Sequence, residues 1–161
     1  MRVITWNMRR AKTGSPSWEY FNEIDPDVAL LQEINELPES IIDKYDHKYL
    51  KACSKSGKDQ QFGTAVLVKG RVSSDLDLSS EIQWIYDEIK LFKGNLVGCV
   101  IEPYDAQPLN VISAYSPAWP VDKKRLHGID LSGIKLDDNP DLWLTEILWC
   151  ALKHADIKES E

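Results

Sequence analysis

Two polar side chains stand out because each lies at the end of an apolar, strand-like segment. Asn7 ends the run RVITWN at residues 2–7, and Glu33 lies near the end of DVALLQEI at residues 27–34. If these segments are parallel neighbours, their carboxyl ends meet at the edge where open α/β sheets bind ligands. An amide and a carboxylate at that edge would suit a hard cation and an anionic substrate.

Both residues also have an ordinary structural interpretation. Asn7 could form an Asx-turn with its own backbone, as Asn side chains commonly do after a strand. Glu33 could pair with an arginine and take part in no ligand contact. The residue types alone leave these alternatives open.

Positive charge is concentrated near the start of the chain, at Arg2, Arg9, Arg10 and Lys12. The whole chain is acidic, with a formal net charge of −7 and a pI near 5.0. Such acidity disfavours sequence-independent nucleic-acid binding, which uses clustered Lys and Arg. The local positive charge nevertheless makes Arg9 and Arg10 candidate substrate-binding residues for a phosphate group. The alternative is that they lie in a solvated turn.

The pattern around these residues predicts a parallel βαβ unit at the start of the chain. Residues 2–7 have apolar side chains on both faces, which is typical of a central strand. Ser15-Pro16 matches an N-cap followed by proline at the first helical position, and Asp25-Pro26 would end the helix. Residues 27–34 then form the second strand, usually after a right-handed crossover.

After Pro38, strand-like runs alternate with turns rich in Gly, Pro, Ser and Asp. The predicted strands are 45–50, 62–68, 82–92, 96–102 and 109–115. Adjacent runs look like antiparallel hairpins, so the predicted fold class is a mixed-sheet α/β or α+β architecture. A last helix is predicted to begin at Asn139-Pro140-Asp141, because an N-cap precedes a proline and an acidic residue.

The length and composition limit the class of protein. With 161 residues, 43% of them hydrophobic, the chain is expected to form a single globular domain over residues 1–161. Three widely separated cysteines, Cys53, Cys99 and Cys150, predict neither a disulfide scaffold nor a zinc site. No signal-type segment or apolar run of about 18 residues is present, so we expect no membrane span and a cytoplasmic location.

Four segments in order, RVITWN, PDVALLQE, FGTAVLVK and LNVISAYSP, resemble the endonuclease/exonuclease/phosphatase family. The resemblance extends over residues 1–120 and is to exonuclease III-like and deoxyribonuclease I-like members. It implies that Asn7 faces the phosphate and that Glu33 binds a divalent metal, Mg²⁺ or Mn²⁺. It also implies a catalytic role for Tyr115, whose alternative is an amphipathic aromatic residue at a sheet edge.

Two later motifs of that family, Gly-Asp-x-Asn and Ser-Asp-His, are absent from this sequence. Asp137-Asp138-Asn139 fits helix capping better, because no glycine precedes it and Pro140 follows. His127 and His154 lack the Ser-Asp context, and we interpret them, like His47, as surface or packing residues. The resemblance thus implies the amino-terminal part of a four-layer α/β/β/α sandwich, truncated before its last strands.

The resemblance implies a metal-dependent phosphodiesterase or nuclease-type domain that hydrolyses phosphate esters. Because the residues for proton transfer are missing, we expect low or no activity from this chain. The alternatives are a non-catalytic module that binds a phosphorylated ligand or partner through Arg9 and Arg10, and an unrelated α/β domain. The substrate, with nucleic acid among the candidates, is left open, and exposed strand edges predict self-association or a complementing chain.

Overall fold

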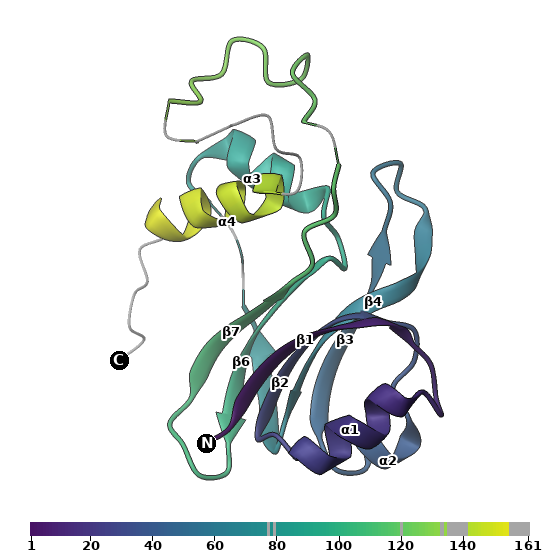
Figure 1. Ribbon diagram of the computed structural model, residues 1–161. Coiled ribbons are helices and arrows are strands. Elements are labelled where there is room, and N and C mark those ends of the chain that lie inside the picture. The colour runs from purple at the N-terminus through teal and green to yellow at the C-terminus, as the bar shows by residue number, and fades with distance from the viewer. Residues whose placement is uncertain (77, 79, 120, 133, 135–141, 155–161) are drawn as a thin grey trace. The chain divides into compact units, whose positions relative to one another are not determined.

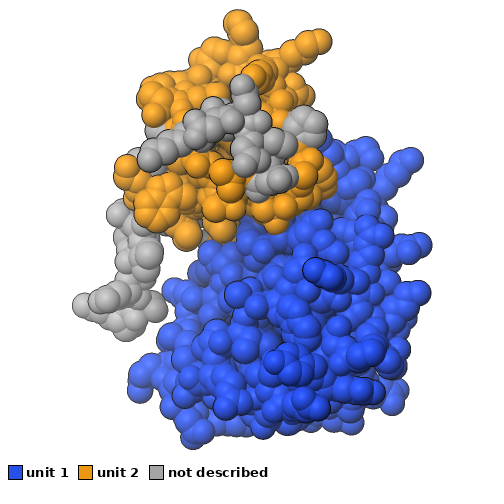
Figure 2. Space-filling view, viewed as in Figure 1, with its two compact units in different colours: residues 1–77, 93–115 blue, residues 78–92, 116–161 orange. Residues whose placement is uncertain are grey.

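The computed structural model describes residues 1–76, 78, 80–119, 121–132, 134 and 142–154. In these residues the chain is a mixed α/β structure with two sheets and four helices (Figure 1). It divides into two compact units, residues 1–77 with 93–115 and residues 78–92 with 116–161 (Figure 2). The single domain expected from the sequence stays a prediction. None of the helices in the described residues is long and apolar enough to cross a membrane.

The first sheet belongs to the first unit and has the strand order β1-β2-β4-β3 (Figure 1). Its strands are β1 (Val3–Ala11), β2 (Val28–Ile34), β3 (Asp46–Cys53) and β4 (Asp59–Val68). β1 and β2 are parallel, whereas β4 is antiparallel to both β2 and β3. The parallel pair, with α1 (Pro16–Ile24) between its strands, confirms the βαβ unit predicted from the sequence.

Both ends of α1 lie where the sequence predicted them. Pro16 lies at the start of the helix, where its missing N–H is not needed. Asp25 follows the last turn in the left-handed conformation with a φ of 47°, and its N–H donates to the carbonyl oxygen of Phe21 over 3.0 Å. Ser15 occupies the N-cap position without capping, because its Oγ accepts the backbone N–H of Lys12 at 2.9 Å.

The second sheet also belongs to the first unit and is antiparallel throughout, in the order β5-β6-β7. Its strands are β5 (Gly70–Asp75), β6 (Leu96–Pro103) and β7 (Leu109–Ala114). β6 and β7 match two predicted strands. β5 was not predicted, because its sequence GRVSSD is polar and mostly exposed, with no apolar alternation.

Apolar side chains cover both faces of the first sheet. On one face, β2 and β4 pack with Trp18 and Phe21 of α1 and with Ile41 of α2 (Glu39–Ile42). The opposite face packs against the second sheet through a set of small and medium side chains: Val28, Val66, Val68, Val97, Cys99 and Ile101. Burial of one Val, Leu, Ile or Phe side chain contributes about 1.5–3 kcal/mol. Helices, first sheet and second sheet therefore form three layers in this unit.

β1 differs from its sequence-based prediction as a central strand. In the described part of the chain it lies at an edge, with β2 as its neighbour on one side. Val3 is 51% exposed, and exposure alternates along the first half of the strand. The prediction of a central strand was based on apolar residues on both faces. In the structure Ile4 and Trp6 are only partly buried where they pack against the core on the helix side of the sheet. An edge strand keeps unpaired backbone groups available to another strand.

The second unit contains α3 (Gln83–Lys90) and α4 (Trp143–His154). Residues 82–92 were predicted as a strand, and this was wrong. Ile85 and Ile89 are buried four residues apart and Phe92 follows three residues later, which is helical spacing. The predicted last helix is confirmed as α4, although its expected start at residues 139–141 lies outside the described residues.

α3 and α4 are joined by a buried carboxylate. Glu88 is 3% exposed and accepts the indole N–H of Trp143 over 3.0 Å. Arg125 lies 2.6 Å from the other carboxylate oxygen and balances its charge. Breaking such a buried pair by removing one partner is strongly destabilising, so Glu88 stabilises the second unit internally.

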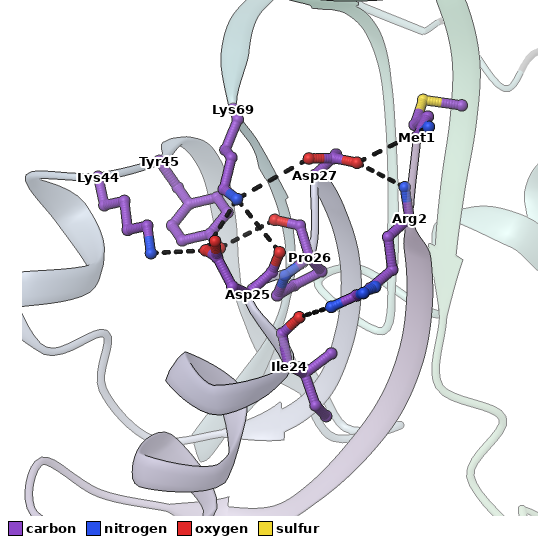
Figure 3. A network of polar contacts seen from close by, with 9 residues as sticks. All are labelled: Met1, Arg2, Ile24, Asp25, Pro26, Asp27, Lys44, Tyr45 and Lys69. Atoms are coloured by element: carbon purple, nitrogen blue, oxygen red, sulfur yellow. Dashed lines mark hydrogen bonds and ion pairs between the residues drawn. The ribbon is translucent and has the colours of Figure 1, made fainter.

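A polar network holds the amino-terminal ends of β1 and β2 (Figure 3). Asp25 lies 2.5 Å from the Lys44 ammonium and 2.8 Å from that of Lys69. These two cations hold the pKa of the Asp25 carboxyl well below its usual range. The backbone N–H of Arg2 donates to Asp27 over 2.5 Å. Arg2 is therefore part of this network and lies at the opposite end of β1 from Arg9 and Arg10.

Cys53, Cys99 and Cys150 are buried, and no disulfide joins them in the described residues. Burial raises the pKa of the Cys99 thiol to about 11. Buried cysteines in apolar surroundings act as small hydrophobic residues. Cys99 accordingly packs between the two sheets.

Candidate functional site

Asn7 and Glu33 meet at the carboxyl ends of β1 and β2. The parallel register places Asn7 opposite Gln32, so that Glu33 is the next residue along β2. The Asn7 amide Nδ2 donates to Glu33 Oε1 over 3.2 Å. The Asn7 carbonyl Oδ1 accepts the backbone N–H of Arg9 at 2.9 Å, which is the Asx-turn of the alternative interpretation. Asn7 therefore forms a local turn through its side-chain oxygen and contacts Glu33, the candidate metal ligand, through its side-chain nitrogen.

The backbone around Glu33 is irregular on both sides. Along β1 the register passes from Asn7 opposite Gln32 to Ala11 opposite Ile34, so three residues of β1 lie opposite Glu33 alone. The pairing of β2 with β4 is interrupted at the same residue. Such bulges are common next to active sites, where they redirect side chains.

Three of the bulge residues have left-handed backbone conformations that disfavour side chains. The φ angles are 49° at Arg9, 63° at Arg10 and 52° at Glu33. Each such residue costs about 1–3 kcal/mol and persists where the surrounding structure enforces it. The three residues are the candidate metal ligand, Glu33, and the two candidate substrate contacts, Arg9 and Arg10. Backbone strain of this kind is frequent at functional sites.

Tyr115 reaches the same place from the second sheet. It follows the last residue of β7, and its phenol lies close enough to the Glu33 carboxylate to be affected by its charge. Burial and the adjacent Glu33 raise the pKa of Tyr115, and the positive charge of Arg10 opposes them. The phenol is therefore neutral at physiological pH and available as a donor. The structure brings the three predicted residues Asn7, Glu33 and Tyr115 together.

A hydrogen bond between the sheets explains how β7 is placed beside β2. The buried Gln32 amide donates to Ser113 Oγ over 3.0 Å and to Leu30 O over 2.9 Å. Ser113 Oγ also lies 3.4 Å from Leu31 O. Gln32 adjoins Glu33, and Ser113 lies two residues before Tyr115. The sequence analysis missed both, although a glutamine within the apolar run VALLQEI was a signal of a buried polar contact.

The two candidate arginines have different surroundings. The Arg10 guanidinium lies 5.2 Å from the centre of the Phe62 ring. Arg9 instead lines an open hollow of about 490 Å³ together with Trp6, Asn7, Met8 and Ser17. Both arginines are exposed, and neither takes part in the ion pairs found among the described residues. They are cations available to an anion.

The donor set at this site suits a metal that keeps most of its own water. In the part of the chain that the structure describes, no three His, Cys, Asp or Glu side chains are grouped so that they could hold a metal ion together. Mg²⁺ is commonly bound through one or two carboxylates together with substrate phosphates and waters. Glu33, held by Asn7 and Tyr115, fits that mode and would be its protein ligand.

His47 lies on β3 and is half-buried, while His127 is exposed in the second unit. The side chain of His154 and residues 137–139 lie outside the described residues. The interpretation of His127 as a surface residue is confirmed.

No protein-family model matches this chain, and no curated protein matches it significantly. The resemblance to the endonuclease/exonuclease/phosphatase family therefore depends on the motif residues themselves. What these residues can do chemically follows from their geometry: a carboxylate, an amide, a neutral phenol and unpaired guanidinium groups converge at the ends of two sheets.

Proposed function

We propose that this chain is a metal-dependent phosphodiesterase-type domain that binds a phosphate ester at Asn7, Glu33 and Tyr115. One observation carries the proposal: Asn7 of β1 and Tyr115, which directly follows β7, both lie beside the Glu33 carboxylate of β2. A shared contact among residues 7, 33 and 115 needs an explanation beyond local turn chemistry. Donors and one carboxylate around a strained strand end suit a phosphate group with a cation beside it.

Each residue has a role that its contacts support. Glu33 would hold Mg²⁺ or Mn²⁺, which when bound neutralises charge on the phosphoryl oxygens. Tyr115 is a neutral donor beside Glu33 and would orient a phosphate oxygen. Asn7 would orient Glu33 through its amide or turn that amide to the substrate. Arg9 and Arg10 would add positive charge at the rim.

We propose low or no hydrolysis by this chain alone. The sequence has no Gly-Asp-x-Asn or Ser-Asp-His segment to handle proton transfer. Loss of a general acid or base lowers the reaction rate about 10²- to 10⁴-fold. We further propose that the two sheets are part of a four-layer α/β/β/α sandwich acting in the cytoplasm.

Hydrolysis and binding of bis(p-nitrophenyl) phosphate with Mg²⁺ or Mn²⁺ test the proposal. We expect binding that Mg²⁺ or Mn²⁺ strengthens, an increase that Glu33→Gln abolishes, and turnover near the background rate. Glu23→Gln, a matched change of an exposed glutamate on α1, is expected to leave binding unchanged. Strong turnover by the isolated chain would contradict the low activity proposed, and metal binding that is indifferent to Glu33→Gln would contradict the site.

A second candidate function is phosphate binding without metal or catalysis. The two exposed and unpaired guanidinium groups beside a single carboxylate favour it. Binding would then depend on salt, because exposed charges are screened. Phosphate binding that is as strong in EDTA and in Glu33→Gln as it is in the unmodified chain with metal would support this candidate over the metal-dependent one.

A further inference from the structure

Phe62 contacts two of the candidate site residues with one buried ring. The ring is 7% exposed and lies on β4, next to Gly63, which pairs with Ile34 of β2. Its centre is 5.6 Å from the Tyr115 ring in an edge-to-face arrangement with an interplanar angle of 83°. The guanidinium of Arg10 lies 5.2 Å from the same centre. Both contacts are in the favourable range for their type.

The backbone of Arg10 supports a directed side chain. Arg10 is held in the left-handed conformation with a φ of 63°, in the bulge opposite Glu33. For an arginine that is only solvated in a turn, no contact of its side chain would offset the cost of this conformation. Resting on an aromatic ring restricts the guanidinium and leaves its N–H donors free for an anion. Arg9, its neighbour, makes no cation–π contact of this kind within the described residues.

We propose that Phe62 is a positioning residue that holds Arg10 and Tyr115 as two sides of a phosphate clamp, with Arg10 as the main source of positive charge. This inference rests on the proposed function, because it concerns the phosphate bound beside Glu33. It adds a residue outside the motif residues and separates the roles of two adjacent arginines. The group recognised is a phosphate with at least two free oxygens, one for each side of the clamp.

Preorganisation is the physical reason for such an arrangement. An arginine that is already restricted loses less rotamer entropy when it binds phosphate. A buried ring also fixes the distance between the guanidinium and the phenol, because neither can move without losing its contact with Phe62. The planar guanidinium presents a rigid fork of N–H donors to phosphate, so lysine at position 10 would keep the charge and lose that fork.

A double-mutant cycle tests the inference, with inorganic phosphate as the probe and NMR titration in EDTA as the measurement. Arg10→Gln is expected to weaken phosphate binding roughly tenfold or more, as for a lost charge-assisted hydrogen bond. Phe62→Leu is expected to weaken it about two- to fivefold, as for a lost cation–π contact. In the Arg10→Gln background, Phe62→Leu should have a clearly smaller effect, because only its contact with Tyr115 remains to be lost.

Three further variants make the outcome decisive. Arg9→Gln should weaken phosphate binding clearly less than Arg10→Gln does, because the Arg9 guanidinium is not among those found over an aromatic ring in the described residues. Arg10→Lys should lose most of the affinity although it keeps the charge, and Phe62→Tyr, which keeps the ring, should retain it. Equal losses from Arg9→Gln and Arg10→Gln, or additive losses in the cycle, would overturn the inference. If Phe62→Leu does not fold, Arg10→Lys is compared with Arg9→Lys, and equal losses from these two variants would overturn the inference as well.

This test separates the clamp from the metal site. The cycle is run without metal, whereas the proposed function fails if Mg²⁺ has no effect that depends on Glu33. Phosphate binding that requires Arg10 and Phe62 while Glu33→Gln changes nothing would support the clamp and contradict the metal role. Metal binding that depends on Glu33, together with phosphate binding that Arg10→Gln and Phe62→Leu leave unchanged, would support the metal site and contradict the clamp.

Discussion

Gln32 of β2 donates its side-chain amide to Ser113 of β7 over 3.0 Å, joining the two sheets immediately below the candidate site. Each partner precedes a site residue on its own strand. Gln32 adjoins Glu33, and Ser113 lies two residues before Tyr115. The contact is buried on both sides, with Gln32 7% and Ser113 1% exposed. It therefore links the stability of the sheet packing to the geometry of the site.

Removing the Gln32 amide is expected to destabilise the fold and loosen the site. Gln32→Leu should lower the free energy of unfolding by about 1–3 kcal/mol, because buried polar partners at Ser113 and Leu30 lose their donor. Urea unfolding measures this change. Phosphate affinity should also fall severalfold, because Tyr115 is no longer held beside Glu33.

Ser113→Ala completes this test as a double-mutant cycle. The Gln32–Ser113 coupling should be roughly 0.5–1.5 kcal/mol. Ser73→Ala, at an exposed serine on β5, should change the unfolding free energy by less than about 0.5 kcal/mol. Additive effects of the two buried substitutions would show that the contact does not couple the sheets.

Gly63→Ala is expected to be among the most damaging small substitutions in the first unit. A methyl group at Gly63 would lie 2.6 Å from the Tyr49 ring and still closer to the carbonyl oxygen of Leu50. Overpacking of this kind costs about 1–3 kcal/mol, and the backbone oxygen cannot move aside easily. Thermal and urea unfolding would detect the loss.

Gly57→Ala is the matched comparison. Gly57 has a φ of 78° with open space around it, so alanine there adds backbone strain alone, about 1 kcal/mol. The Gly63 variant should be the less stable of the two. Equal stability would show that β3 and β4 do not approach as closely at Gly63 as the structure has them.

Acid should remove the stabilisation contributed by Asp25. Lys44 and then Lys69 depress the pKa of Asp25 in the folded chain, whereas the unfolded value is about 3.9. Between these two values the unfolded chain binds more protons, so stability rises with pH there. The contribution is fully present above about pH 3.9 and is lost as the pH falls through the depressed folded value.

Asp25→Asn should therefore be less stable than the unmodified chain at neutral pH and show a shallower acid dependence. Urea unfolding as a function of pH measures both quantities. High salt should reduce the difference, because the Asp25 side chain is 46% exposed and its ion pairs are screened. Asp105→Asn, at an exposed acid, is the control, and an identical acid dependence in both variants would rule out the Asp25 network as the cause.

The local part of the fold and three of the site residues could be predicted from the sequence. β1, α1 and β2 follow from apolar patterning and from signals at Pro16 and Asp25, and parallel pairing then brings Asn7 to Glu33. The helix at residues 83–90 was missed, because its many apolar and aromatic residues resemble a buried strand as well as one helix face.

The contacts between the sheets could not be predicted in the same way. Gln32 and Ser113 are 81 residues apart, and no local pattern states that they pair. Phe62 was seen as an apolar strand residue, and its contacts with Arg10 and Tyr115 depend on where three separate strands end. The positive φ angles at Arg9, Arg10 and Glu33 also have no sequence signal, since none of these residues is glycine.

Self-association is expected through the free edge of β1. The strand has unpaired backbone groups on its outer side among the described residues, and Val3 is 51% exposed. Sedimentation velocity over a range of concentrations should show association that Val3→Lys weakens, because a charged side chain on an edge strand disfavours pairing with another strand. Tyr104→Lys, at an exposed aromatic residue outside the strands, is the control. A monomer at every concentration would contradict this expectation.

The most direct test of the Glu33 metal site is paramagnetic broadening by Mn²⁺ in the NMR spectrum of the chain with phosphate present. If Glu33 is the metal ligand, the signals of Asn7, Glu33 and Tyr115 broaden at low Mn²⁺, and Glu33→Gln removes the effect while Glu23→Gln does not. Broadening centred on Asp25 and Asp27, or broadening at residues 7 and 115 that survives Glu33→Gln, would contradict a metal site at Glu33.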